Sequence, residues 1–309
     1  MTGRIVLGSR GSALAIEQAR LAREALAGAQ PGLEVALKVI TTSGDRRQEA
    51  RAGDGGAAGL KGLFTKEIQE ALLAGEIDAA VHSLKDLPGI TPPELGIAAV
   101  LPRADTADVL ICREARGLAG LRDGARVGTG SVRRRRQLAW LRRGLELVEL
   151  RGNVPTRLEK LAGLDGIVLA RAGLVRLGYR FAGGALECDA GRFPLEALDI
   201  LPAIGQGAIG IETRVDDEDV NGMMKAIDHE ETHACVRVER ELLRLLDGDC
   251  RLPVGARATL RGSMIEAAAI VFPEDESKPP AEARATGAAS DPGGIAGRLF
   301  EQLSSTFKA

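Results

Sequence analysis

The segment His229-Glu230-Glu231-Thr232-His233 has the HExxH spacing that could support metal chemistry. In that pattern two histidines one helical turn apart bind zinc, and the glutamate activates a water molecule. The only other histidine of the chain is His82, so a third zinc ligand would have to be a carboxylate such as Glu239. A zinc hydrolase is therefore one hypothesis, and the alternative is a polar helix start that binds no metal.

A second pattern, Gly205 to Gly210, reads GQGAIG and matches the GxGxxG loop that binds dinucleotides. That fingerprint requires a preceding strand and a helix that opens within the glycines. Here Pro202 precedes the glycines, and Ile209 to Glu212 alternates like a strand. We therefore expect a close backbone approach or a hinge at these glycines, and no nucleotide site.

Four consecutive arginines, Arg133 to Arg136, follow the Gly/Ser turn at residues 128–131. Such a run is often a solvated helix face. The free N–H groups and the positive dipole end of a helix start also favour anions, so Thr129, Ser131 and the first two arginines could hold carboxylates or phosphates. Arg10 and Ser12 form a similar pair at the first predicted helix, and two such sites on paired units would face one cleft.

Composition narrows the choice of ligand. The 41 positively charged residues include only eight lysines, and an arginine excess can reflect either anion recognition or a G+C-rich genome. With a net charge of −2, six Phe, one Tyr and one Trp, the chain has neither the basic field nor the stacking side chains of a nucleic-acid-binding protein. The four scattered cysteines predict reduced thiols, with no zinc cluster or disulfide framework.

The elements that must position these residues predict an α/β protein. The length of 309 residues allows two or three domains. Apolar patterning predicts strands that alternate with helices. The predicted helices lie near Ser12 to Leu26 and Thr65 to Leu73, and the predicted strands are 4–8, 34–41, 78–82, 96–100 and 109–112. The pattern restarts at Ala125 with a strand, the Gly/Ser turn and a helix through Leu141. It continues with strand 146–150, a helix from Pro155, strand 166–170 and a helix from Ala172.

A third unit follows, with a long helix over 228–246, strands near 254–260 and 265–271, and a terminal helix over 294–306. We expect two similar α/β domains, one formed by residues 1–101 with 208–225 and one by 107–200, and a C-terminal α+β domain at 230–309. No apolar run approaches the roughly 20 residues of a membrane span, and the N-terminus lacks a hydrophobic signal core. We therefore expect a cytoplasmic protein with no membrane partner.

Seven short blocks carry a family resemblance. Together they resemble porphobilinogen deaminase (hydroxymethylbilane synthase), because they occur in that family's order over nearly the whole chain, which is far more specific than any one block. The blocks are GSRGS at 8–12, KGLF at 61–64, VHSLKDLP at 81–88, GTGSVRR at 128–134, LRGNV at 150–154, LPAIGQG at 201–207 and GDCRLPVG at 248–255.

The resemblance implies two periplasmic-binding-protein-like, doubly wound α/β domains around a cleft and a small α+β domain that bears a cysteine on a loop. It also implies a dipyrromethane cofactor joined by a thioether to that cysteine, here Cys250. On this primer the family condenses four porphobilinogen molecules with loss of ammonia, and hydrolysis then frees the linear tetrapyrrole. The resemblance further implies a monomer and no metal.

The resemblance also assigns residues. Asp86 would be catalytic, because a carboxylate can hydrogen-bond pyrrole N–H groups, stabilise the cation left by ammonia loss and carry the proton released. The primer and four added units bring many acetates and propionates into one cleft, which arginines would offset. The implied cofactor contacts are Ser83, Lys85, Asp86, Thr129, Ser131, Arg133, Arg134 and Cys250. The implied substrate contacts are Arg10, Ser12, Phe64, Arg151, Arg157, Arg176 and Gln206.

One position departs from the family pattern, because Asp249 stands where the family usually has glycine before its cysteine. A neighbouring carboxylate disfavours a thiolate, so we expect slower primer attachment than with glycine there.

Two other hypotheses remain beside the deaminase. One is a solute-binding module, which would share the paired α/β units but leave Cys250 and the third domain unexplained, and the other is the zinc hydrolase using His229 and His233.

Overall fold

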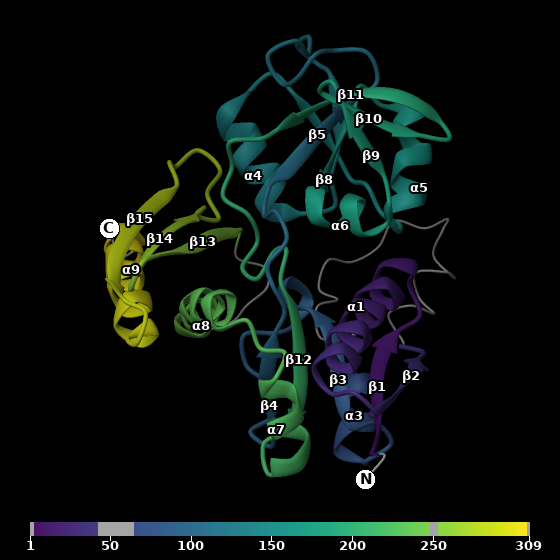
Figure 1. Cartoon of the computed structure of the whole chain (residues 1–309). Coiled ribbons are helices and arrows are strands. Elements are labelled where there is room, and N and C mark those ends of the chain that lie inside the picture. Colours follow the sequence, from purple (N-terminus) through teal and green to yellow (C-terminus); the bar gives the residue numbers. More distant parts are fainter. Residues whose placement is uncertain (1–2, 43–64, 247–252, 308–309) are drawn as a thin grey trace.

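The computed structural model describes residues 3–42, 65–246 and 253–307 and contains three separate sheets (Figure 1). The first sheet has the order β2-β1-β3-β12-β4, the second β7-β6-β8-β5-β11-β10-β9 and the third β13-β14-β15. In Figure 1 the second sheet lies above the first, and the third lies to one side of both. The prediction of two α/β units and a smaller α+β unit is therefore confirmed.

The first sheet is covered by helices on both faces. Its strands are β1 (Arg4–Arg10), β2 (Glu34–Ile40), β3 (Ala79–Ser83), β4 (Leu95–Val100) and β12 (Ile209–Arg214), and its helices are α1 (Ala13–Ala29), α3 (Lys66–Leu73) and α7 (Glu218–Lys225). Alternate residues of β1 point to opposite sides: Ile5 and Leu7 pack in the cluster of α1, whereas Val6 packs in that of α3. This is the doubly wound arrangement that the resemblance implied.

The second sheet repeats the arrangement. Its strands are β5 (Asp108–Cys112), β6 (Arg126–Gly128), β7 (Glu146–Val148), β8 (Gly166–Ala170), β9 (Arg180–Ala182), β10 (Ala185–Cys188) and β11 (Gly191–Ala197). Its helical segments are α4 (Val132–Leu141), α5 (Val154–Glu159), η2 (Lys160–Gly163) and α6 (Arg171–Arg176). Val109 and Ile111 pack with Leu158 and Leu174 on one face, whereas Leu110 packs with α4 on the other.

Among the described residues, the third sheet carries helices on one face only. Strands β13 (Val254–Arg261), β14 (Met264–Val271) and β15 (Ala281–Ala288) are antiparallel, and α8 (Glu230–Leu245) and α9 (Pro292–Phe307) pack on them. Small residues such as Ala258 and Ala267 fill the inner face against Val238 and Leu299. The outer face is turned toward the second sheet and the segment that leads from it.

Two chain segments cross between the first and second sheets and lie side by side. Leu101 N–H donates to Ile209 O at 3.0 Å, and Ala104 N–H donates to Gly207 O at 3.1 Å. Gly207 has φ +83°, and a Cβ there would collide with Ala104 O, so the close approach requires glycine. The segment after Gly207 enters β12 and no helix, in agreement with the expectation of a close approach rather than a nucleotide loop.

All three sheets are connected at Glu239 on α8, which is 1% exposed. Its carboxylate forms a bidentate ion pair with Arg103 of the first crossing segment at 2.7 and 2.9 Å. It also accepts from Gly205 N–H of the second crossing segment and from Ala258 N–H of β13, both at 2.8 Å. Glu239 is therefore fully engaged in joining the domains and is not placed as a metal ligand.

Several elements were not predicted. They are β9, β10 and β11, the helix α7 and the edge strand β15. The strand β15 has the sequence AEARATGA, whose inward residues are mostly alanines too small to produce an obvious apolar alternation. In the described part of the chain, no helix combines the length and apolarity that a membrane span requires.

Candidate active site between the two α/β domains

Asp86, the predicted catalytic residue, and Lys85, a predicted cofactor contact, lie where β3 ends. The strand passes directly into a single 3₁₀ turn, η1 (Leu84–Asp86), whose Leu84 side chain is buried while Lys85 and Asp86 are half-buried. Gly205 allows the second crossing segment to pack over this turn, because a Cβ there would be 2.9 Å from Leu84 Cβ. The turn is therefore held rigidly at the end of the first sheet.

Lys85 lies in a strongly perturbed environment. Burial is the largest influence and lowers the pKa of the ammonium to about 8, and the neighbouring charge of Asp86 opposes that shift. The charges of Arg134 and Arg133, which belong to the second domain, lower the pKa further. Lys85 is thus close to two arginines from the opposite side of the interdomain boundary.

A buried carboxylate, Asp108 at the start of β5, holds those two arginines. Its Oδ2 is 2.7 Å from Arg133 Nη1, and its Oδ1 is 2.7 and 2.9 Å from Arg134 Nη2 and Nε. Burial alone would raise the pKa of Asp108, but Arg134 and Arg133 outweigh it and hold the pKa well below its usual value. Asp108 was not predicted, because nothing in the local sequence indicates which distant arginines it meets.

The same carboxylate also binds Gln206 of the second crossing segment. Gln206 Nε2 donates to Asp108 Oδ1 at 2.9 Å and to Thr106 O at 2.7 Å, while its buried Oε1 has no hydrogen-bond partner among the described residues. Arg133 Nε is likewise buried without a described partner, although Arg133 Nη1 donates to Leu201 O at 2.7 Å. Two polar atoms near Asp108 thus remain able to bind a ligand.

Two further arginines of the second domain are desolvated near the same boundary. Burial lowers the pKa of Arg157 to about 10; the charge of Arg134 lowers it further and that of Asp86 opposes the shift. Burial also lowers the pKa of Arg176 to about 10. Arg157 Nε donates to Gly152 O, and Arg176 Nη2 donates to Gly207 O, each at 2.7 Å. Neither arginine is ion-paired within 4.0 Å to a described carboxylate, so both retain capacity for an anion.

Two of the predicted hydroxyl groups, those of Ser12 and Ser131, act as N-caps. Ser12 accepts from Ala15 N–H at 3.3 Å at the start of α1, and Ser131 accepts from Arg134 N–H at 3.4 Å at the start of α4. Thr129 is fully buried, and its Oγ1 accepts from Ser131 N–H at 3.2 Å. Ser83 exchanges hydrogen bonds with the Gln18 amide at 2.7 and 2.9 Å. The predicted capping role of Ser12 is thus confirmed.

The remaining predicted residues have different surroundings. Arg151 forms an exposed ion pair with Glu149 at 2.7 Å, which an incoming anion would have to displace. Arg10 is half-buried at the end of β1. Phe64 and Cys250, and the departing residue Asp249, lie outside the described residues.

A narrow pocket joins the two α/β domains at this place. Leu14, Gln18, Ser83 and Lys85 line it from the first domain, and Arg176 lines it from the second, together with Ala170, Ala172 and Gly173. The backbone of Gly205, Gly207 and Ala208 closes one side. The structure therefore brings Ser83, Lys85 and Arg176 into one pocket. The charges of Asp86, Arg133 and Arg134 act on Lys85, and those of Arg134 and Asp86 act on Arg157, so these groups lie near the pocket.

Comparison with known proteins decides the family. The family model for the porphobilinogen deaminase dipyrromethane cofactor-binding domain matches residues 5–222, and the model for the porphobilinogen deaminase C-terminal domain matches residues 233–303. The chain belongs to the porphobilinogen deaminase family. The porphobilinogen deaminase of Roseiflexus sp. (strain RS-1) is 43% identical over 301 residues, covering 97% of this chain and 95% of the relative. That of Moorella thermoacetica is 48% identical over 266 residues, covering 84% and 80%.

Among solved structures, the chain is similar to the methionine-binding protein MetQ, with a TM-score of 0.45 and 16% sequence identity. The match covers 72% of this chain and 89% of MetQ. The sequence-based predictions of the family, of a transferase that forms a linear tetrapyrrole and of a dipyrromethane cofactor are confirmed by the family assignment. The hypothesis of a non-catalytic solute-binding module is therefore set aside.

The described residues also fit the cofactor of this porphobilinogen deaminase family member. Dipyrromethane carries carboxylate side chains and pyrrole N–H groups. The site has more cationic groups than its two carboxylates, Asp86 and Asp108, can neutralise. The cationic groups are Lys85, Arg133, Arg134, Arg157 and Arg176. In addition, Arg133 Nε is a buried donor and Gln206 Oε1 a buried acceptor, each without a hydrogen-bond partner among the described residues. Such a donor set suits a polycarboxylate that also offers N–H groups.

The zinc hypothesis finds no support in the described part of this family member. His229 is the N-cap of α8, with Nδ1 3.2 Å from Thr232 N, and His233 Nδ1 lies 2.9 Å from Asp228 Oδ1. Asp228 also accepts from Val100 N–H at 2.7 Å, so it is part of the junction with β4. Among the described residues, no group of three His, Cys, Asp or Glu side chains could hold a metal ion. The HExxH match is therefore the start of a structural helix.

Proposed function

We propose that Asp86 is the catalytic carboxylate of this hydroxymethylbilane synthase and that the desolvated cations around it bind the carboxylates of cofactor and substrate. The enzyme condenses four porphobilinogen molecules head to tail with release of ammonia, and hydrolysis frees the linear tetrapyrrole. The observation that carries the proposal is the excess of buried positive charge on both sides of Asp86, which only an anionic ligand would offset.

Asp86 suits this role because of its position. It is half-buried at the end of a rigid turn, and its charge acts on both Lys85 and Arg157. Loss of ammonia leaves positive charge on the pyrrole of a substrate unit, and a fixed carboxylate beside the ring nitrogen stabilises that charge. The same carboxylate accepts the proton released when the ring regains aromaticity and can return it in the next cycle.

The proposed contacts divide by ligand, and each ligand is held by residues of both α/β domains. The cofactor carboxylates would be held from both domains, which keeps the primer between them. The first domain contributes Ser83 and Lys85, and the second contributes Thr129, Ser131, Arg133 and Arg134. Arg157, Arg176 and Gln206 would contact the incoming substrate, joined by Arg10, Ser12, Arg151 and Phe64. When bound, the cofactor supplies the pyrrole carbon to which the first substrate unit is joined.

Attachment of the cofactor is proposed at Cys250. Among the described thiols, burial raises the pKa of Cys112 to about 11, and burial also raises the pKa of Cys235. Cys188 lies on β10 in the strands of the second sheet that are farthest from β6 and the turn before α4. None of these three is placed as a reactive thiolate beside Asp86, which favours the residue that the family resemblance assigns.

We also propose the domain limits 1–101 with 208–225, 107–200 and 230–309, a monomeric state, cytoplasmic location and no nucleic-acid partner. The strand β12 lies between β3 and β4 in the first sheet, which supports the return of residues 208–225 to the first domain. The helix α8 opens at Glu230, after the last residues of the first sheet, which supports the third limit.

The decisive experiment is the denatured intact mass of the purified chain, with peptide mapping around Cys250. We expect a two-pyrrole adduct on Cys250 that is absent from Cys250→Ser and retained in the control Cys188→Ser. Incubation of the loaded enzyme with porphobilinogen should add further pyrrole units, and Asp86→Asn should slow that addition at least 100-fold. A chain that gains no pyrrole mass after incubation with porphobilinogen would contradict the proposal.

A further inference from the structure

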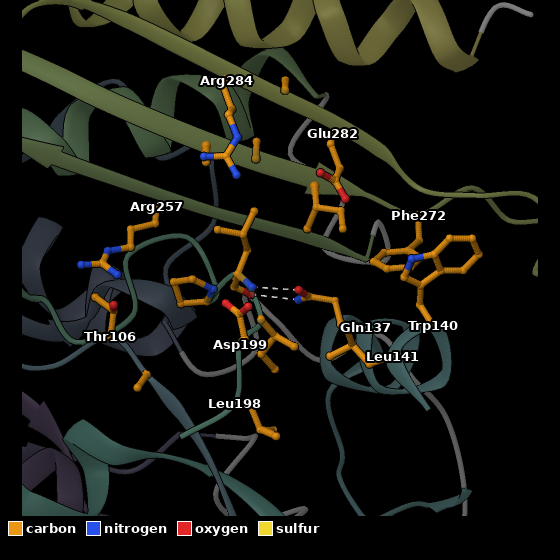
Figure 2. Close-up of a pocket in the computed structure, with 18 of the residues that line it drawn as sticks. Thr106, Gln137, Trp140, Leu141, Leu198, Asp199, Arg257, Phe272, Glu282 and Arg284 are labelled. Carbon is orange, nitrogen blue, oxygen red and sulfur yellow. Dashed lines mark hydrogen bonds between the residues drawn. The ribbon is translucent and has the colours of Figure 1, made fainter. Parts of the chain in front are cut away.

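A cavity of about 430 Å³ lies outside the cleft, between the second and third domains. It is bounded by α4, by the crossing segment 198–202 and by the outer face of the C-terminal sheet (Figure 2). It shares no lining residue with the narrow pocket beside Lys85. Cavities of this size at domain boundaries are typical of sites for small molecules.

One side of the cavity is aromatic and apolar. Trp140 and Leu141 on the last turn of α4 remain 43% and 50% exposed, which is unusual for side chains of their size. Phe272 at the end of β14 is buried, and the Arg136 guanidinium lies 5.6 Å from the centre of its ring. Trp140 and Leu141 therefore offer an exposed surface on which a flat ring could pack, with Phe272 behind them.

The opposite side carries two arginines in strict register. Arg257 of β13 pairs with Ala268 of β14, and Ala268 pairs with Arg284 of β15, so the three side chains lie on one face of the sheet. Two strand spacings separate the arginines by about 10 Å, with only a methyl group between them. Both are exposed, and neither forms an ion pair with a described residue. They form a fork open to two carboxylates.

The cavity also contains carboxylates. Glu282, two residues before Arg284 on β15, is exposed and has no ion pair with a described residue. Figure 2 shows Glu282 on the side of Phe272 and Trp140, with Arg257 and Arg284 on the other side. Asp199 lies between the two sides, near Gln137. A simple dianion would be repelled by these carboxylates, whereas a ligand that also carries an ammonium group would match both signs of charge.

We infer that this cavity is a second, non-catalytic binding site for porphobilinogen, a flat aromatic ring that bears two carboxylates and an aminomethyl group. The two carboxylates bind Arg257 and Arg284, the ammonium faces Glu282, and the pyrrole packs against Trp140 beside Leu141. The choice of ligand rests on the proposed function, since the substrate of the enzyme is the molecule of this chemistry that it meets.

The cavity is lined by residues of the second α/β domain and of the C-terminal domain, so a ligand in it contacts both. The Gln137 amide binds the Leu201 backbone in both directions, donating to O at 2.9 Å and accepting from N–H at 2.8 Å, as Figure 2 shows. The next residue, Pro202, accepts from Ala256 N–H of β13 at 3.0 Å. A ligand between Trp140 and Arg257 would therefore bridge two elements already joined through 201–202.

The test uses Trp140, which is the only tryptophan of the chain and so reports this cavity without background. Holoenzyme is mixed rapidly with porphobilinogen, and tryptophan fluorescence is extrapolated to the time of mixing, before turnover. We expect a saturable change whose half-saturation concentration rises about fivefold in Arg257→Ala or Arg284→Ala and about 25-fold in the double variant. The control Arg261→Ala, an exposed arginine at the end of the same strand, should behave as wild type.

A second pair of measurements tests the charge pattern. Glu282→Gln should weaken porphobilinogen about fivefold but should not weaken 1,4-phenylenediacetate, which has two carboxylates and no ammonium. A fluorescence change that the double arginine variant leaves intact would overturn the site, and equal effects of Glu282→Gln on both probes would overturn the assignment of the ligand. Formation of the linear tetrapyrrole by the wild type tests the proposed function separately. The double variant should retain wild-type kcat/KM at low substrate, because the cavity lies outside the cleft.

Discussion

The buried carboxylate of Asp108 provides the sharpest test of how the site is held together. Asp108 is 0% exposed, and its partners Arg133 and Arg134 are only 6% and 5% exposed. In Asp108→Asn the shape is kept and the charge is lost, which leaves two buried guanidinium groups without their counterion. Removing one member of a buried ion pair costs about 3–5 kcal/mol, so we expect the free energy of unfolding at pH 7 to fall by about that amount.

The pH dependence follows from the lowered pKa of Asp108. A carboxylate whose pKa is depressed on folding contributes stability above its unfolded pKa of 3.8, and that contribution is lost as the pH falls through the folded value. The gap between wild type and Asp108→Asn should therefore be constant near neutral pH and should narrow only below about pH 4. Urea unfolding of the holoenzyme, followed between pH 3 and 8, measures both quantities.

The matched control is Asp105→Asn, three residues earlier. Asp105 pairs with Arg171 at 3.2 Å, but both side chains are close to half exposed, so the loss should stay below about 1 kcal/mol. If the two variants lose the same free energy, or if the gap for Asp108→Asn does not depend on pH below 4, Asp108 does not hold the arginines as described.

Three further predictions concern single positions. Because burial lowers the pKa of Lys85 to about 8, loss of its charge should raise KM for porphobilinogen as the pH increases through about 8, and Lys85→Arg should remove that rise in a pH–rate profile. Gln137→Met removes both bonds to Leu201 and should cost about 2–3 kcal/mol in urea unfolding, whereas Gln137→Glu should recover stability at low pH, where a protonated carboxyl can restore both bonds. His229→Ala should cost about 1 kcal/mol as a lost N-cap and leave kcat unchanged, and a large fall in kcat would restore the catalytic interpretation of HExxH.

Local sequence determined much of the framework. Apolar alternation and capping residues act within a few positions, so β1, α1, β3, α4 and α8 were placed from the chain alone, including the cap at Ser12. The family block at 81–88 likewise contains Ser83 and Lys85, which line the narrow pocket between the α/β domains. By contrast, β15 was missed because its inward alanines give little hydrophobic contrast, and its packing depends on Ile295 and Leu299 of a helix formed later in the chain.

Only the tertiary structure decided which charges meet. The sequence shows four arginines in a row but not that Arg133 and Arg134 share Asp108, some 25 positions earlier, or that Gln206, 98 positions after Asp108, binds the same carboxylate. It shows HExxH but not that Asp228 engages His233. It also cannot show that Arg257 and Arg284 stand in register across Ala268. Ion pairs and cavities form between segments brought together by packing, so their partners are fixed by the fold and not by spacing along the chain.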